Sequence, residues 1–157
     1  MGKSLTRVAK AIAELGLTSD ITETGTAKTA AQAAAALNCQ VDQIAKSIVL
    51  AGAESGTLFL FLTAGARQVD LDAASALAGE PLTKAQATVV RQVTGFAIGG
   101  VSPVGHLTPI RGEVDITVVT VDTIFAAAGT PNHVFDVTPD ALQRATNAVK
   151  SDFVQKM

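Results

Sequence analysis

The chain has neither tryptophan nor tyrosine, and its only cysteine is Cys39. A single cysteine excludes an intrachain disulfide framework, which fits a reducing compartment, so we expect a cytoplasmic protein. The shortage of aromatic residues argues against a base-stacking platform for single-stranded nucleic acid. No stretch approaches the roughly 18 uninterrupted apolar residues of a membrane-spanning helix, and we expect neither a signal peptide nor a membrane partner.

Excess positive charge is also missing, because the formal net charge is −2 at pH 7. This argues against binding along DNA or another long nucleic acid, where a basic face supplies most of the affinity. A small contact with the end of a nucleic acid remains open. The two histidines, His106 and His133, have no cysteine or acidic residues at ligand spacing beside them, so we expect no metal ion and no other cofactor.

What the chain does contain is enough apolar material for a core: 157 residues, of which 48% are hydrophobic. This length predicts one domain over residues 1–157. Strand-like and helix-like segments are mixed without strict alternation, which favours an α+β fold. We expect a single mixed, mostly antiparallel sheet flanked by helices.

Capping residues mark most of the expected helices. They are residues 5–15 before Gly16, 30–37 between Thr29 and Asn38, a short turn at 41–45, 69–79 ending at Gly79, 83–95 between Thr83 and Gly95, and 139–150 after Thr138. The expected extended segments are 17–23, 47–52, 58–63, a β-branched stretch within 110–129, and 132–137.

The segment "GGVSPVGH", from Gly99 to His106, interrupts the pattern of helices and strands. Adjacent glycines allow unusual backbone conformations and let a ligand approach the main chain, whose N–H and C=O groups can bind a polar substrate. The alternative is a tight connection that only turns the chain. The segment is neither a G-x-G-x-x-G fingerprint nor a phosphate-binding P-loop.

Lys46 stands at the mouth of the strand expected over residues 47–52. It is either a surface lysine with a solvated tip or a charge directed at a ligand. Cys39 follows Asn38 at a helix end, where a structural thiol is the better interpretation and a thiol enzyme is an alternative. No G-x-S-x-G elbow of a serine hydrolase is present.

Four segments in order resemble the YbaK/EbsC-type aminoacyl-tRNA editing domains. They are "KTAAQAAAALNCQVDQIAKSIVL", "RQVDLDAASALAG", "VTGFAIGGVSPVGH" and "AAAGTPNHVFDVTPDAL". The resemblance covers roughly residues 24–147. The family occurs as free proteins and as an insertion in bacterial prolyl-tRNA synthetase. The resemblance implies a mixed α/β sheet flanked by helices and hydrolysis of the ester that joins a wrong amino acid to tRNA.

The resemblance also implies where the site lies. Lys46 matches a family lysine that points into the substrate site, Gly99–Pro103 matches the G-x-x-x-P signature, and His133 matches a histidine of many members. The expected catalytic residues are Lys46, Gly99 and His133. The expected substrate-binding residues are Thr24, Gly100, Ser102, Pro103 and His106.

Two segments depart from the family pattern. "IRGEVD" is more polar than the apolar strand usual before the family's aspartate, here Asp115. "TPNH" stands where other free members carry Lys-Arg-Gly, which leaves the amino acid specificity open.

The function expected from these observations is a deacylase for mischarged tRNA, acting on tRNA for proline that carries a small wrong amino acid such as alanine, cysteine or serine. Its partners would be the 3′ end of aminoacyl-tRNA and prolyl-tRNA synthetase. The alternative is a non-catalytic module that binds aminoacyl-tRNA or a synthetase in the same pocket.

Overall fold

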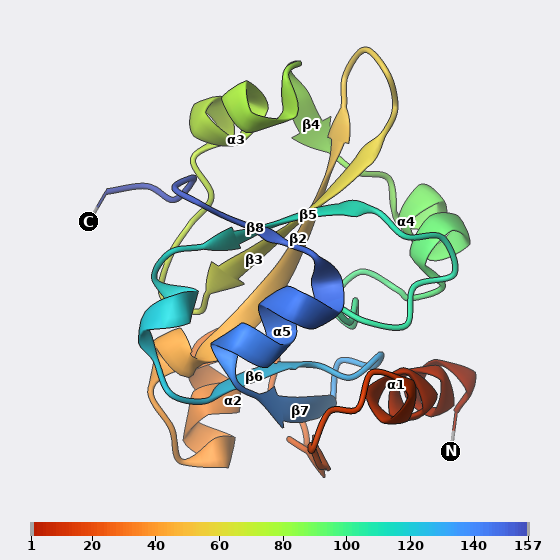
Figure 1. Ribbon diagram of the computed structural model, residues 1–157, viewed down its shortest axis with the longest axis vertical. Coiled ribbons are helices and arrows are strands. Elements are labelled where there is room, and N and C mark those ends of the chain that lie inside the picture. The colour runs from red at the N-terminus through yellow and green to blue at the C-terminus, as the bar shows by residue number, and fades with distance from the viewer. Residues whose placement is uncertain (1, 157) are drawn as a thin grey trace.

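The computed structural model describes residues 2–156 and is built on one eight-stranded mixed sheet (Figure 1). The strand order is β1-β7-β6-β2-β3-β5-β8, and β4 pairs with β2 outside this path. The strands are β1 (Ile21–Glu23), β2 (Ile44–Gly52), β3 (Leu58–Ala64), β4 (Leu82–Lys84), β5 (Arg111–Asp115), β6 (Ile124–Ala127), β7 (His133–Val137) and β8 (Val149–Ser151). Four pairings are antiparallel and three are parallel, which confirms the expected mixed α+β fold.

Within residues 2–156, five α-helices flank the sheet. They are α1 (Lys3–Glu14), α2 (Ala30–Leu37), α3 (Leu71–Ala78), α4 (Ala87–Thr94) and α5 (Pro139–Thr146), with short 3₁₀ turns η1 (Val41–Gln43) and η2 (Val118–Thr120). Thr29 and Thr138 are the N-caps expected from the sequence, and the side chain of each accepts a hydrogen bond from a backbone N–H of its helix. Asn38, Gly79 and Gly95 end their helices in the left-handed conformation, as the sequence predicts.

Three expectations about the elements were wrong. β2 begins at Ile44, so Lys46 lies inside the strand and not at its mouth. Thr83 belongs to β4, which pairs with the far end of β2, and α4 begins only after Gln86. The last helix stops at Asn147, which has a φ of 55°, and residues 149–151 form β8 beside β5. In each case pairing with a distant strand prevails over the local signal.

Apolar side chains form a core on each face of the sheet. The larger cluster contains Val8 of α1, Phe96 and Phe135, all fully buried. The smaller cluster joins β3 to α3 and the C-terminal segment, and the Phe61 and Phe153 rings meet edge to face with centroids 5.0 Å apart. Burial on both faces explains why every residue of β3 is buried.

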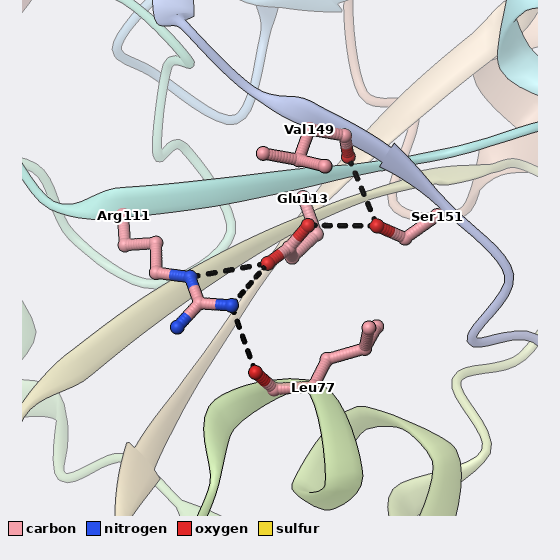
Figure 2. A network of polar contacts seen from close by, with 5 residues as sticks. All are labelled: Leu77, Arg111, Glu113, Val149 and Ser151. Atoms are coloured by element: carbon pink, nitrogen blue, oxygen red, sulfur yellow. Dashed lines mark hydrogen bonds and ion pairs between the residues drawn. The ribbon is translucent and has the colours of Figure 1, made fainter.

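A polar network explains the unusual polarity of "IRGEVD" (Figure 2). The Glu113 carboxylate is buried, and one of its oxygens accepts hydrogen bonds from Arg111 Nε and Nη2 at 3.1 and 2.8 Å. The other oxygen accepts from Ser151 Oγ at 2.8 Å, and Arg111 also donates to Leu77 O. The network ties β5 to β8 and α3, so its polar residues are satisfied within the fold.

The sheet is incomplete along one edge of β2. On that edge β6 pairs only with Ile44 and Ala45, and β4 pairs only with residues 50–52. Figure 1 shows β6 and β4 near opposite ends of the long β2 strand. Among residues 2–156, the intervening segment 46–49 has a neighbouring strand on its β3 side alone. No helix within the described residues is long and apolar enough to cross a membrane.

Candidate functional site

A cavity of about 340 Å³ opens beside the incomplete edge of β2. It brings together the three residues expected to be catalytic, Lys46, Gly99 and His133, which are separated by up to 87 positions in the sequence. Its walls come from the loop before α2 and α2 itself, from β2, from the 98–101 loop, and from β6, β7 and their connection. Cavities of similar volume near α5 do not include these residues.

Lys46 enters the cavity from the third position of β2. It is half-buried, and its Nζ donates a hydrogen bond to Arg67 O at 2.6 Å. Burial lowers the pKa of Lys46, while the nearby Asp42 carboxylate acts in the opposite direction. Because an ammonium group has three donors, two N–H groups remain after the bond to Arg67.

The loop that supplies the Arg67 carbonyl is held against η1. Asp42 accepts a hydrogen bond from Ala66 N at 3.0 Å and lies 3.7 Å from Arg67 Nε. A Cβ at Gly65 would lie 2.2 Å from Val41 O, so this close approach requires glycine. This support of Lys46 was not predicted from the sequence.

The two adjacent glycines of the 99–106 segment are required for different structural reasons. Gly99 lines the cavity with a φ of +95°, a conformation that favours glycine. Gly100 is needed for space, because a Cβ there would lie 2.9 Å from the Cα and C atoms of Thr130. The N–H of Gly100 donates to Ala97 O at 3.0 Å, and Gly100 does not itself line the cavity.

His133 begins β7, and its Nδ1 lies 2.7 Å from the Thr130 hydroxyl. Thr130 Oγ1 also accepts a hydrogen bond from Asn132 N at 3.2 Å, so the hydroxyl links the turn to the imidazole. The ring is therefore held through Nδ1. Thr24 is buried next to this turn and donates its backbone N–H to Asn132 O at 2.7 Å, but it does not line the cavity.

The remaining expected substrate-binding residues lie outside this cavity. Pro103 and His106 line a separate cavity of about 380 Å³ on the side of α1. Ser102 is fully buried, and its carbonyl accepts a hydrogen bond from His106 Nε2. Burial lowers the pKa of His106, and the bond to Ser102 partly opposes this change. The geometry gives these residues a role in shaping the 99–106 loop.

Cys39 does not line the cavity either. Burial raises the pKa of its thiol, which disfavours the thiolate that a nucleophilic cysteine needs. No group of three or more histidine, cysteine, aspartate or glutamate residues within positions 2–156 lies close enough to hold a metal ion.

Most of the wall consists of side chains that sequence reasoning missed. They include Ala30 and Ala33 of α2, Ile48 of β2, and Phe125 and Ala127 of β6. Alternation along the strands predicts which of these residues share a face, but the gap between β6 and β4 is not visible in the sequence. The charged side chains of the wall are Lys28 and Lys46, and no carboxylate belongs to it. The site is therefore a small, largely apolar pocket with positive charge.

Comparison with known proteins identifies the family of this chain. The aminoacyl-tRNA editing domain family matches residues 24–145, so the chain belongs to that family. An uncharacterised protein of Bacillus subtilis (strain 168), YwhH, is 30% identical over 124 residues, which are 78% of either chain.

Two solved structures share the fold over nearly the whole chain. One, described as a proposed trans-editing enzyme for prolyl-tRNA synthetase, is 39% identical, covers 99% of both chains and superimposes with a TM-score of 0.93. The other, the hypothetical protein APE2540, is 27% identical over 95% of this chain and 99% of its own, with a TM-score of 0.86. These findings confirm the resemblance and the fold expected from the sequence.

Proposed function

We propose that the protein is a deacylase that hydrolyses the ester of mischarged tRNA, with tRNA for proline carrying alanine, cysteine or serine as its substrate. The observation that carries this proposal is the single cavity lined by Lys46, Gly99 and His133 in a chain of the aminoacyl-tRNA editing domain family. The similarity to a proposed trans-editing enzyme for prolyl-tRNA synthetase supports the choice of tRNA and of that synthetase as a partner.

Lys46 binds the terminal adenosine of the tRNA in this proposal. Its two free N–H groups meet phosphate or ribose oxygens, while the bond to Arg67 O fixes the direction of the side chain. Since one nucleotide end is recognised, a basic face is unnecessary, in agreement with the net charge of −2.

Hydrolysis proceeds by positioning and electrostatics. An aminoacyl ester is already activated, and a water molecule can attack it without a protein nucleophile. The Gly99 backbone holds the ester, and the neighbouring ribose hydroxyl assists the attack. His133, held through Nδ1 by Thr130, positions the water or the substrate.

The pocket wall selects a small amino acid. Alanine, isoleucine, valine and phenylalanine side chains line the space, so a small amino acid side chain packs against them in this proposal. Such a pocket discriminates by about 10- to 200-fold per methylene.

A paired measurement separates the enzyme from a binding module. Purified protein is given alanyl-tRNA for proline, and in parallel a non-hydrolysable amide analogue of the alanylated terminal adenosine. The proposal predicts turnover of the first and competitive inhibition by the second. Binding of the analogue without turnover of any charged tRNA, even with prolyl-tRNA synthetase present, would favour the binding module instead.

A further inference from the structure

Ser47 lies beside Lys46 on β2 and lines the same cavity. Its Oγ is buried, yet it has no hydrogen-bond partner within residues 2–156. Most buried hydroxyl groups are paired, so an unpaired one on a cavity wall marks a place where a ligand completes the bonding.

The main chain of Ser47 faces the open edge of β2. Gly52 N donates to Thr57 O on the β3 side, whereas Ala53 N donates to Pro81 O on the β4 side. Because hydrogen-bonding direction alternates along a strand, the N–H and C=O of Ser47 point to the same edge as those of Ala53. On that edge β6 pairing ends at Ala45, and β4 pairing begins at Leu50.

The charges of the wall decide what these groups can bind. An aminoacyl ester has a cationic α-amino group, but no carboxylate belongs to the cavity wall. The acceptors that the wall offers to this cation are therefore neutral oxygen or nitrogen atoms. Successive side chains of a strand point to opposite faces, so Ser47 directs its hydroxyl away from Lys46.

We propose that Ser47 is the residue that binds the α-amino group of the aminoacyl ester, with its Oγ and its unpaired C=O as acceptors. This inference rests on the proposed function for the class of ligand. Lys46 then binds the nucleotide end, and Ser47 binds the amino acid end of one substrate.

The test uses two amide analogues of the acylated terminal adenosine, one alanyl and one propionyl, which differ by the α-amino group. Binding of each is measured by calorimetry for the wild type and for Ser47→Ala. The wild type should bind the alanyl analogue more tightly than the propionyl analogue. In Ser47→Ala the ratio of the two dissociation constants should fall about tenfold, because a hydrogen bond to a charged group is removed. Ser47→Thr, which keeps the hydroxyl, should retain the preference.

Ser151→Ala is the matched control, because its hydroxyl is satisfied by Glu113 outside the cavity. It should lower the melting temperature and leave the preference unchanged, whereas Ser47→Ala should not lower the melting temperature. A Ser47→Ala protein with unchanged preference, or with equal losses for both analogues, would overturn the assignment. So would a fall in its melting temperature, since the hydroxyl would then have a partner in the fold.

The binding experiment remains informative if turnover is absent. Ser47-dependent preference without hydrolysis of any charged tRNA would refute the deacylase and support the assignment of Ser47. Hydrolysis of alanyl-tRNA with no dependence on Ser47 would support the deacylase and overturn the assignment.

Discussion

Replacing Gly100 by alanine tests how closely the two loops of the site depend on each other. The new Cβ would lie 2.9 Å from the Cα and C atoms of Thr130 and 3.2 Å from Pro131 N. Optimal carbon contacts are about 3.5–4.0 Å, so one backbone must retreat by roughly 0.6 Å or more. The obstructing atoms are main chain and cannot move aside by a rotamer change.

This displacement has two measurable consequences. Overpacking of this kind costs about 1–3 kcal/mol, which lowers the melting temperature of a chain of this size by roughly 3–9 °C. The shift also carries Thr130, and with it His133, away from Gly99. Because a misplacement of about 1 Å can cost 100-fold in rate, we expect kcat/KM for deacylation to fall by about 10- to 100-fold.

Gly112→Ala is the matched control within β5. A Cβ there would meet Ala148 Cβ at 3.5 Å, which is ordinary contact. Thermal unfolding and deacylation of alanyl-tRNA are measured on both variants, and the control should behave like the wild type. Wild-type stability and rate in Gly100→Ala would refute the reasoning, because the two loops would then not depend on their close approach.

Four further predictions concern single side chains. Lys46→Ala should lose at least about 100-fold in deacylation with its melting temperature retained. Analogue binding by the wild type should weaken as the pH rises and Lys46 loses its charge, and because burial lowers the pKa of Lys46 this loss should begin below the pH at which an exposed lysine titrates. Lys46→Arg should not show this pH dependence. Thr130→Val should lower kcat by about tenfold through the lost contact with His133, and Thr130→Ser should restore it; equal activity of the two variants would argue against this role. Glu113→Gln should cost about 2 kcal/mol in chemical denaturation, because the buried Glu113 carboxylate loses its charge-assisted bonds to the half-exposed Arg111, with no change in kcat/KM; unchanged stability would show that the pair contributes nothing. Cys39→Ser should be fully active in the same assay, and inactivity would revive the thiol mechanism.

Local signals predicted much of the fold. Thr29 and Thr138 bond to their own helix ends, and Asn38, Gly79 and Gly95 terminate helices, because capping depends on residues close in sequence. Such features can be derived from the sequence without knowledge of the distant partners.

Long-range pairing set the elements that the sequence did not predict. Thr83 is a good N-cap by composition, yet its segment completes the edge of β2 as β4. Lys46 lies inside β2 because pairing with β6 and β3 extends the strand back to Ile44. The cavity exists only because β6 and β4 leave the edge between them open, and no local pattern encodes that gap.

The sequence also identified the three cavity residues Lys46, Gly99 and His133 in advance through family resemblance, but not the means by which they are held. The carbonyl of Arg67 and the hydroxyl of Thr130 come from loops whose approach depends on Gly65 and Gly100. A glycine required for close approach looks the same in sequence as one required for a turn.

The most direct test of the central claim is a deacylation panel on tRNA for proline charged separately with proline, alanine, cysteine, serine and 2-aminobutyrate. Each substrate is given to the wild type and to Lys46→Ala, with and without prolyl-tRNA synthetase. The proposed function predicts rapid loss of one small wrong amino acid, sparing of proline, and little activity in the variant. Absence of hydrolysis for every substrate, or equal hydrolysis by the Lys46→Ala protein, would contradict it.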